Sequence, residues 1–361
     1  MNESTRELEL KDLGYSDFFE GNRGPVIDSN LTPARIIAEH KELYILRNAT
    51  SEFSAKITGK MMFAASSRED YPAVGDWVLI TILNVGQAII REILPRKTVL
   101  VRKSVGKTDS QIIASNIDTA FIIQSPDRDY NLNRFERYLS LAESENIEPV
   151  IVLNKIDLIS ESDLEIKLLG IKTRFKGTHI YTTSVVTGKG IAEFRRSIKR
   201  GLTYCFIGSS GVGKSSIINM LAGEDLIKTG EISSRTNRGK HITAHREIFI
   251  LENGGLLIDN PGMREIGVVD SEAGIKNVFS AIYDLSKKCK YSDCTHINEP
   301  GCAVLAAIDF GALDQDKYDN YIKLLKETEY NTMTKLEKRK KDRKFGSFIK
   351  TTKKQIKKYK F

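Results

Sequence analysis

The sequence predicts a multidomain α/β protein, with a small β-barrel first, a doubly wound sheet second and a helical region last. Residues 1–104 hold five or six short Val- and Ile-rich runs, with too little chain between them for crossover helices. Residues 105–270 alternate apolar runs with helix-like stretches, as parallel sheets do. Residues 271–361 read as mostly helical and contain a cysteine cluster. We therefore expect three domains with these bounds.

The composition is that of an ordinary globular protein. Of the 361 residues, 40% are hydrophobic and 28% are charged, which excludes a largely disordered or collagen-like chain. No apolar run approaches the roughly 18–20 residues that cross a bilayer, and the polar N-terminus lacks the apolar core of a signal peptide. Four cysteines are too few for a disulfide scaffold of this length. We expect a cytoplasmic protein without a membrane partner.

The positive charge is concentrated at the C-terminus. Residues Lys335–Phe361 contain 13 Lys and Arg and two acidic residues, a net charge of +11. The whole chain carries +8, so the other residues together carry −3. Such a tail fits a nucleic acid or an anionic membrane as partner, and it equally fits a solvated chain end.

The first region predicts a barrel. Five or six short strands in about 100 residues suit a small antiparallel barrel, with the OB-fold as the first choice. Many OB-folds bind oligonucleotides, although a fold alone does not give a function. The expected strands are Ala34–Glu39, Leu43–Arg47, Phe53–Ile57, Asp76–Leu83, Gln87–Ile93 and Thr98–Val101.

The second region predicts a doubly wound sheet. In the helix-like stretch Asn133–Glu145, the residues Phe135, Tyr138, Leu139 and Ala142 share one face. Alternating strands and helices of this kind imply parallel strands with crossover helices. The expected strands are Thr119–Gln124, Pro149–Leu153, His179–Tyr181, Tyr204–Ile207, Ile248–Leu251 and Leu256–Ile258.

A phosphate-binding loop (P-loop) follows the strand Tyr204–Ile207. The segment fits G-x-x-x-x-G-K-[ST] and precedes a helix that begins near Lys214, the context that this motif requires. Its backbone N–H groups would surround the β-phosphate, Lys214 would reach the β- and γ-phosphates, and the Ser215 hydroxyl would bind Mg²⁺. The loop residues are Gly208, Ser209, Ser210, Gly211, Val212, Gly213, Lys214, Ser215 and Ser216.

A base-selecting motif, N-K-x-D, follows the strand Pro149–Leu153. The carboxylate of Asp157 can accept two hydrogen bonds from guanine, whereas adenine offers an acceptor where guanine has N1–H. The Lys155 stem can lie along the purine ring, and Asn154 completes the motif. Thr183 and Ser184, after the strand His179–Tyr181, fit the loop that closes over the base.

Two further motifs would sense the γ-phosphate. Asp259-Asn-Pro-Gly262 matches D-x-x-G, so that Asp259 would hold Mg²⁺ through water and the Gly262 N–H would meet the γ-phosphate. Thr243 is our choice for the switch threonine that binds Mg²⁺, with Thr236 as the competitor. Such segments become ordered on GTP and relax after hydrolysis.

The order of these motifs is circularly permuted. In ordinary GTPases the P-loop comes first, but here N-K-x-D at 154 and the Ser184 loop precede the P-loop at 208 and D-x-x-G at 259. Permutation is tolerable because domain termini usually lie close together at the surface. Its consequence is that the D-x-x-G switch leads directly into the C-terminal region. We therefore predict a circularly permuted P-loop GTPase domain.

The residue that orients the attacking water is missing from its usual position. Ras-like enzymes place a glutamine beside the D-x-x-G glycine, but this sequence has Met263, whose thioether cannot orient water. We infer slow intrinsic turnover, with the catalytic group supplied by another segment or by a partner. His241 is the best internal candidate, and it could equally be a surface residue or a phosphate contact.

The cysteine cluster predicts a zinc site. Cys289, Cys294, His296 and Cys302 lie within 14 residues. Three thiolates and one imidazole form a closed tetrahedral shell, which is typical of a structural Zn²⁺. Reduced cysteines without a metal are the alternative. The fourth cysteine, Cys205, lies in the strand before the P-loop and is expected in the core.

Taken together, these motifs resemble the ribosome small-subunit-dependent GTPase A family, a group of circularly permuted bacterial GTPases, over nearly the whole chain. The resemblance implies an N-terminal OB-fold, a permuted GTPase domain and a C-terminal zinc domain, a hydrophobic residue at Met263 and a histidine at His241. The segments that carry it are Val74–Val78, Ile112–Asp118, Asn131–Tyr138, Pro149–Asp157, Gly208–Ser216, Gly239–Thr243, Asp259–Glu265 and Cys289–Val304.

The resemblance also implies a function. Family members act in late assembly of the small (30S) ribosomal subunit, which stimulates their hydrolysis of GTP to GDP and phosphate. We therefore expect the small subunit and its 16S rRNA as partners, Mg²⁺ with GTP, one structural zinc, a monomeric protein and release after hydrolysis. The switch differs from that of relatives, which often have several threonines after the histidine where this chain has Thr243 alone. No role can be transferred to the lysine-rich tail.

Two other functions compete with this one. A GTP-dependent RNA-binding module would bind structured RNA without the ribosome, with an affinity that hardly changes with the nucleotide. A P-loop ATPase or small-molecule kinase is disfavoured by Asp157, and equal competition by ATP would favour it.

Overall fold

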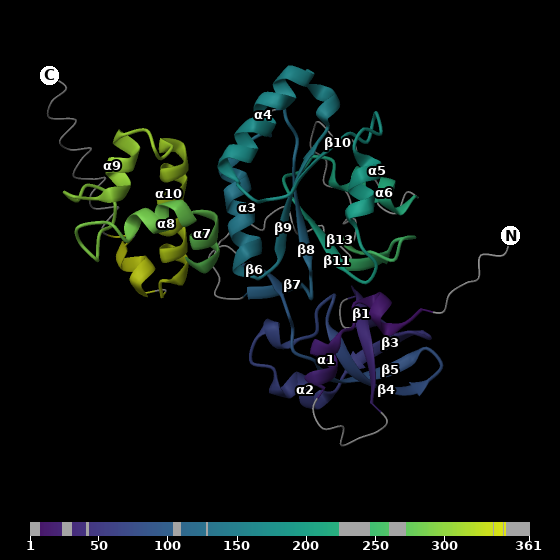
Figure 1. The fold of residues 1–361 in the computed structure, drawn as a ribbon. Coiled ribbons are helices and arrows are strands. Elements are labelled where there is room, and N and C mark those ends of the chain that lie inside the picture. Colours follow the sequence, from purple (N-terminus) through teal and green to yellow (C-terminus); the bar gives the residue numbers. More distant parts are fainter. Residues whose placement is uncertain are drawn as a thin grey trace, which may run out of the picture. The chain divides into compact units, whose positions relative to one another are not determined.

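The structure, a computed structural model, describes residues 8–23, 31–40, 43–103, 110–127, 129–223, 246–259, 272–334, 336–341 and 343. The chain divides into two compact units, Met1–Gly267 and Val268–Phe361, drawn as ribbons in Figure 1. Among the described residues, every helix is too short or too polar to span a lipid bilayer.

The first five strands form a closed barrel with the OB-fold topology. They pair in the order β1-β2-β3-β5-β4, and β4 returns to β1 with Thr32 opposite Ile80 and Arg35 opposite Trp77. The pairing of β3 with β5 is parallel and the other four pairings are antiparallel, so the expected OB-like barrel is confirmed, with one parallel pair in an otherwise antiparallel barrel. The strands are β1 (Thr32–His40), β2 (Leu43–Arg47), β3 (Glu52–Ile57), β4 (Trp77–Asn84) and β5 (Gln87–Ile93).

The sixth expected strand lies outside the barrel. The run Thr98–Val101 contributes to β6 (Val99–Lys103), which pairs with β7 (Ser110–Ser115) in a separate two-stranded sheet. The reason is that β1 and β4 already close the barrel, so this part of it offers no open edge for a further strand. The barrel therefore has five strands, the lower of the two numbers expected.

A buried arginine joins the N-terminal segment to the barrel. Arg35 on β1 is 1% exposed, and its guanidinium donates to the carbonyl oxygens of Leu13 (2.6 Å), Gly75 (3.2 Å) and Asn116 (3.1 Å). Burial lowers the pKa of Arg35 to about 10, while the charges of Asp118 and Asp76 oppose this shift. Since a buried cation needs such partners, these three backbone segments are held together.

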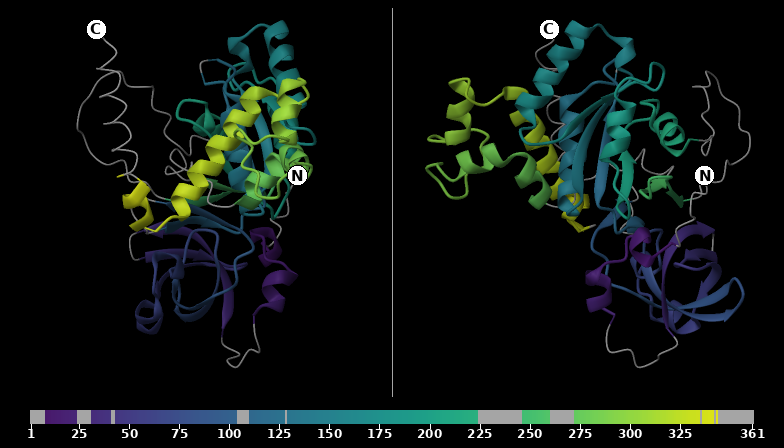
Figure 2. Two further views of the ribbon diagram at one scale, coloured as in Figure 1. Left: turned by 90° about the vertical axis from the view of Figure 1, so that its left-hand side faces the viewer. Right: turned by 45° about the vertical axis from the view of Figure 1, so that its right-hand side comes forward.

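The remaining strands of the first unit form a mostly parallel sheet, in the order β10-β9-β8-β11-β13-β12, with only β12 antiparallel. Helices α3 and α4 cover one face and α5 and α6 the other (Figures 1 and 2). The strands are β8 (Thr119–Gln124), β9 (Glu148–Asn154), β10 (Ile180–Thr183), β11 (Thr203–Ile207), β12 (Arg246–Ile250) and β13 (Leu256–Asp259). The helices are α3 (Leu132–Ser144), α4 (Glu161–Arg174), α5 (Ile191–Ser197) and α6 (Lys214–Ala222).

The central strands are buried because helices cover both faces. Every residue of β8 and β11 is buried. Phe121 on β8 stacks on Tyr204 of β11, with ring centroids 5.2 Å apart, and meets Phe194 of α5 edge-on at 4.7 Å. Such continuous apolar runs are typical of parallel strands with two covered faces, and this is why the sequence identified these strands.

The barrel and the parallel sheet are joined edge to edge. Strand β12 pairs with β13 on one side and with β1 of the barrel on the other, where Ala38 lies opposite Glu247 and Glu39 opposite Arg246. The two sheets therefore form one sheet of 11 strands. The predicted domain boundary near residue 104 stays a prediction, because the barrel and the parallel sheet belong to one compact unit.

The second unit is helical around its own core. Its helices are α7 (Glu272–Val278), α8 (Ser280–Ser286), α9 (Ala303–Asp309) and α10 (Gln315–Thr332). Apolar side chains from all four helices form the core, among them Ile275, Ile282, Val304 and Leu324. Cys302 belongs to this core, and Cys289 and Cys294 pack against it. The cysteine cluster therefore lies where the helices meet.

Candidate nucleotide site and metal centre

The predicted nucleotide-binding motifs lie at one edge of the parallel sheet. These motifs follow four parallel strands: β9 ends at Asn154, β10 at Thr183, β11 at Ile207 and β13 at Asp259. In the sheet β9 pairs with β10 and β11 pairs with β13, and β8 lies between the two pairs. Their carboxyl ends therefore meet at the same edge, where open α/β sheets bind ligands. Residues far apart in the sequence are brought together by this topology.

The P-loop needs glycine at both ends. A Cβ on Gly208 would stand 2.3 Å from the carbonyl oxygen of Ile123, and a Cβ on Gly213 would stand 2.3 Å from Nδ2 of Asn154. Gly213 also has a φ of +96° at the N-cap position, directly before α6. Only glycine allows the loop to pass this close to the ends of β8 and β9.

Lys214 folds back over the P-loop. Its Nζ donates to the carbonyl oxygens of Gly208 and Ser209, both at 2.6 Å. The ammonium group is therefore held within the loop whose N–H groups and helix N-terminus suit an anion. Phosphate oxygens can take over these hydrogen bonds from the carbonyl groups.

The N-K-x-D motif is tied directly to the P-loop. Asn154 is 1% exposed; its Nδ2 donates to the Val212 carbonyl oxygen at 2.9 Å, and its Oδ1 accepts from the Thr183 hydroxyl at 3.0 Å. Nζ of Lys155 donates to the Gly211 carbonyl oxygen at 2.7 Å. Asn154 thus connects the P-loop, the base-selecting motif and the following loop.

The loop after β10 holds the base-selecting carboxylate. The Ser184 hydroxyl donates to Oδ1 of Asp157 at 2.5 Å and accepts from the Thr187 N–H at 3.1 Å. A Cβ on Gly190, whose φ is +75°, would stand 1.8 Å from the Thr182 carbonyl oxygen, so the return of this loop requires glycine. Asp157 is therefore oriented by Ser184 and keeps a second oxygen for a ligand.

Several predicted residues lie outside the described part of the chain. They are Thr236, His241, Thr243, Gly262 and Met263. For Asp259 the structure gives the strand position, at the end of β13, but its side chain is not among those described.

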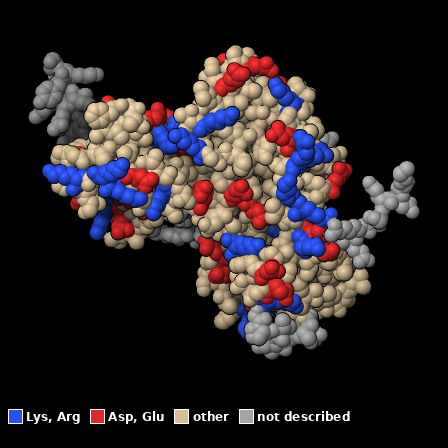
Figure 3. All heavy atoms as spheres, in the orientation of Figure 1, with Lys and Arg blue, Asp and Glu red and all other residues tan. Residues whose placement is uncertain are grey.

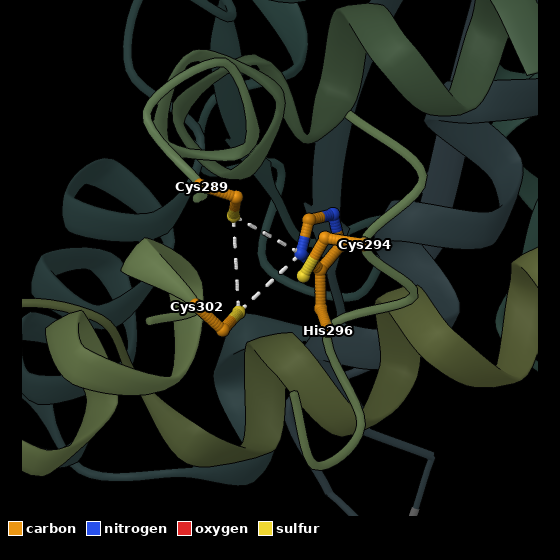
Figure 4. A group of neighbouring side chains, drawn as sticks. All are labelled: Cys289, Cys294, His296 and Cys302. Atoms are coloured by element: carbon orange, nitrogen blue, oxygen red, sulfur yellow. Dashed lines mark hydrogen bonds between the residues drawn. The ribbon is translucent and has the colours of Figure 1, made fainter. Parts of the chain in front are cut away.

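Cys289, Cys294, His296 and Cys302 come together in the second unit (Figure 4), and their ligand atoms all lie within 4.8 Å of one another. Sγ of Cys289 is 3.9 Å from Sγ of Cys302, and each of these sulfurs is 3.5 Å from Nδ1 of His296. A tetrahedral zinc with bonds of about 2.3 Å to sulfur and about 2.05 Å to nitrogen requires separations of roughly 3.8 and 3.5 Å. The group could therefore hold a metal ion such as zinc.

The electrostatics of this cluster suit a cation. Burial opposes ionisation of Cys289, but N–H groups of α9 and the neighbouring thiols outweigh it, so its pKa lies below the usual value. Burial and the neighbouring thiols raise the pKa of Cys294 to about 11, and burial lowers the pKa of His296. The Cys289 thiol thus ionises readily, ionisation of Cys294 beside it is unfavourable, and the His296 imidazole stays neutral. A bound cation would make the second thiolate favourable as well.

Comparisons with known proteins agree with this geometry. The model of the RsgA GTPase family matches residues 93–269, and a model described as 50S ribosome-binding GTPase matches residues 203–338. The small ribosomal subunit biogenesis GTPase RsgA of Opitutus terrae is 39% identical over 90% of each chain. RsgA 1 of Bacteroides thetaiotaomicron is 38% identical over 98% of this chain and 99% of its own.

The chain belongs to the RsgA family of GTPases. Two solved structures have a similar fold: YjeQ from Thermotoga maritima (TM-score 0.63, 26% identity, 82% of this chain and 98% of that one) and YloQ (TM-score 0.62, 25% identity, 85% and 98%). YloQ is described as a circularly permuted GTPase. The permuted motif order of this chain agrees with that description, and as a member of the RsgA family this chain is a GTP hydrolase.

The sequence analysis missed a contact between α3 and the P-loop. Nη1 of Arg134, in the first turn of α3, donates to the Ser209 hydroxyl at 2.8 Å and pairs with the Asp129 carboxylate. A sequence signal for this contact was available. Arg134 is a cation at the start of α3, which follows β8, and β8 is the neighbour of β11, the strand that leads into the P-loop. In this RsgA protein the hydrogen bond from Arg134 holds Ser209, the second residue of the P-loop.

Proposed function

We propose that this GTPase binds the small (30S) ribosomal subunit late in its assembly, and that hydrolysis stimulated by the subunit releases it. The support is that the two RsgA relatives, which match about nine-tenths or more of the chain, are named small ribosomal subunit biogenesis GTPases. The proposal that the subunit stimulates hydrolysis rests on Met263, which stands where Ras-like enzymes have the glutamine that orients water. A catalytic site that lacks this group fits an enzyme whose site a partner must complete.

The site residues take the following proposed roles. Lys214 and the N–H groups of the P-loop hold the phosphates, with the Gly262 N–H at the γ-phosphate. Ser215, Thr243 and Asp259 hold Mg²⁺, which would neutralise developing charge on the phosphates. Asp157 selects guanine. The support for these roles is the convergence of four strand ends and the hydrogen bonds that link Asn154 to the P-loop.

The missing catalytic group is proposed to come from the switch segment after contact with the subunit. His241, two residues before Thr243, is the candidate within the chain. Stimulated hydrolysis by His241→Ala protein should be lost while the slow basal rate persists. Unchanged stimulation would remove this residue from the proposal.

The other parts of the chain are proposed to bind ribosomal RNA and a structural zinc ion. The barrel and the basic tail would contact 16S rRNA, and the Cys289 cluster would bind one structural zinc. On the face shown in Figure 3, one group of Lys and Arg lies along the flank where α5 lies. The last turn of α5 itself contains Arg195 and Arg196. Such a group favours an anionic partner. We further propose that the protein is located in the cytoplasm and is a monomer.

Co-sedimentation with purified subunits tests the proposal. The protein should pellet with 30S subunits in a non-hydrolysable GTP analogue and remain in the supernatant with GDP. Lys214→Ala protein, which loses the phosphate-binding ammonium group, should show no difference between the two nucleotides. Equal pelleting of the wild-type protein with both nucleotides, or pelleting with 50S subunits alone, would contradict the proposal.

A further inference from the structure

A cavity of about 460 Å³ opens at one end of the barrel. It lies between the C-terminal end of β1, the start of β2, the end of β3, the connection from β3 to β4, and β7. The mouths of β-barrels are a preferred place for ligand sites, and this volume falls within the range of about 300–1,000 Å³ that such sites occupy. None of the GTPase motifs contributes to this cavity.

The floor of the cavity is apolar and partly aromatic. Ile112 and Ala73 are buried, and Ile57 is half-buried. Tyr44 on β2 is also buried, and Tyr71 is the second aromatic residue of the lining. An apolar floor with two aromatic side chains suits a planar ring.

The rim of the cavity is polar and mainly basic. Lys56 and Arg68 are exposed cations on its border. Glu39 and Gln111 add a carboxylate and a carboxamide to the wall. The arrangement combines a floor for a ring, hydrogen-bonding groups for its edge and cations for an attached phosphate.

We propose that this cavity binds one unpaired nucleotide of an RNA strand. The base would lie on the apolar floor, its amino group would donate to Glu39 or Gln111, and its flanking phosphates would meet Lys56 and Arg68. Recognition of single-stranded RNA relies on this combination of splayed bases and backbone cations. The inference rests on the proposed function in one respect, since it needs RNA at the barrel.

Helix α2 (Gly59–Ala64) adds an exposed apolar surface beside the cavity. It buries none of its residues; Phe63 is 94% exposed, and the neighbouring Met62, which is 51% exposed, lines the cavity. An exposed phenylalanine beside a base-sized cavity can stack on the next base of the same strand. This favours an RNA strand over a free mononucleotide, which would leave Phe63 without a function.

One residue of the cavity wall, Glu39, lies on a strand that pairs with β12. Glu39 in its wall is paired through the backbone with Arg246, the first residue of β12. A nucleotide held against Glu39 therefore lies one strand from Arg246, which follows Thr243 by three residues in the sequence. This gives bound RNA a short structural path to the GTPase site.

The test measures binding of labelled hexaribonucleotides (A6, C6, U6 and one mixed sequence with guanine) by fluorescence anisotropy. The protein is saturated with GDP and Mg²⁺, so that the GTP site is filled. Met62→Trp should fill the mouth of the cavity and weaken binding by about 10-fold or more, as loss of one stacked base does. Leu169→Trp, at a residue that is 67% exposed on α4, is the matched control and should bind as the wild type does.

A second pair of variants tests the cations. Lys56→Ala should make the slope of log affinity against log salt less negative by about 0.7, the value for one phosphate contact of a single strand. Lys172→Ala removes the same charge from an exposed residue on α4, outside the lining and away from α2, and should leave the slope unchanged. Equal effects of the two variants would overturn the proposal.

The outcomes separate this inference from the proposed function. Absence of hexamer binding by the wild type, or full binding by Met62→Trp, overturns the cavity proposal whatever ribosomal subunits do. Competition by AMP, CMP or UMP at the same concentration as the hexamer would make the cavity a mononucleotide site and overturn the RNA assignment. Failure of subunits to stimulate hydrolysis would instead refute the proposed function.

Discussion

Replacing Asn154 by Ala should disconnect the three parts of the GTP site. The side-chain amide joins the Val212 carbonyl oxygen in the P-loop (2.9 Å) to the Thr183 hydroxyl on β10 (3.0 Å). Alanine cannot make either bond, and Val212 and Thr183 are both at most 1% exposed. Their polar groups therefore lose a partner without gaining ready access to water.

The expected loss of folding and binding free energy follows from this burial. A buried donor or acceptor left without its partner costs about 1–3 kcal/mol, so the two groups together cost about 2–6 kcal/mol. Part of this appears as lower stability of the nucleotide-free protein. The rest appears as weaker binding, because the loops must be ordered by the nucleotide; we expect the Kd for GDP to rise about 10-fold or more, which is 1.4 kcal/mol.

A double-mutant cycle tests the assignment of these bonds. Thr183→Val removes only the Asn154–Thr183 bond, so the double variant should lose less than the sum of the single variants, by about 0.5–1.5 kcal/mol. Fluorescent GDP titration gives the affinities, and urea unfolding gives the stability. Strictly additive losses, or an Asn154→Ala protein that binds GDP as tightly as the wild type, would refute the reasoning.

Three further predictions concern the base selector, the metal cluster and the buried thiol. Asp157→Asn should weaken GTP binding by about 100-fold or more, because two hydrogen bonds to a charged group are lost, and xanthosine triphosphate should bind instead; retained GTP affinity would contradict the role of Asp157. Cys302→Ser should reduce the zinc content from one ion per chain toward zero and lower the thermal stability of the second unit, and stoichiometric zinc in the variant would exclude this ligand. Burial raises the pKa of Cys205 from 9.0 to about 12 in the folded protein. The unfolded chain therefore loses this proton first, and stability should fall by about 1.4 kcal/mol per pH unit between pH 9 and 12; Cys205→Ala protein should lack this contribution, and identical pH profiles of the two proteins would contradict it.

The candidate site could be predicted from the sequence because its motifs are local. The P-loop, N-K-x-D and the cysteine cluster each occupy a short stretch of chain, and the strands before them are continuous apolar runs such as Thr119–Gln124. Contacts between motifs were not predictable in the same way. The hydrogen bond from Arg134 to Ser209 joins residues 75 positions apart, and the local sequence around neither residue specifies the other.

The fold was less predictable where pairing is long-range. The run Thr98–Val101 has the composition of a barrel strand, but the pairing of β1 with β4 closes the barrel without it. The parallel pairing of β3 with β5 likewise depends on topology rather than on residue type. Arg35 is charged, which predicts exposure, and only three carbonyl oxygens from distant segments make its burial tolerable.

The pairing of β1 with β12 gives the barrel a direct connection to the GTPase site. Strand β12 begins at Arg246, three residues after Thr243, and its other edge pairs with β13, which ends at Asp259. One proposed Mg²⁺ ligand, Asp259, thus ends a strand pair that is continuous with the barrel, and another, Thr243, precedes this pair by three residues in the sequence. A change in these segments between GTP and GDP has a direct structural path to the RNA-binding parts proposed here.

The most direct test of the account is GTP hydrolysis with and without purified small ribosomal subunits, with large subunits as the control. The account predicts slow turnover by the protein alone, strong stimulation by small subunits and none by large subunits, because the small subunit completes a site that lacks the usual glutamine. Equal, slow turnover in all three samples, or stimulation by large subunits alone, would contradict it.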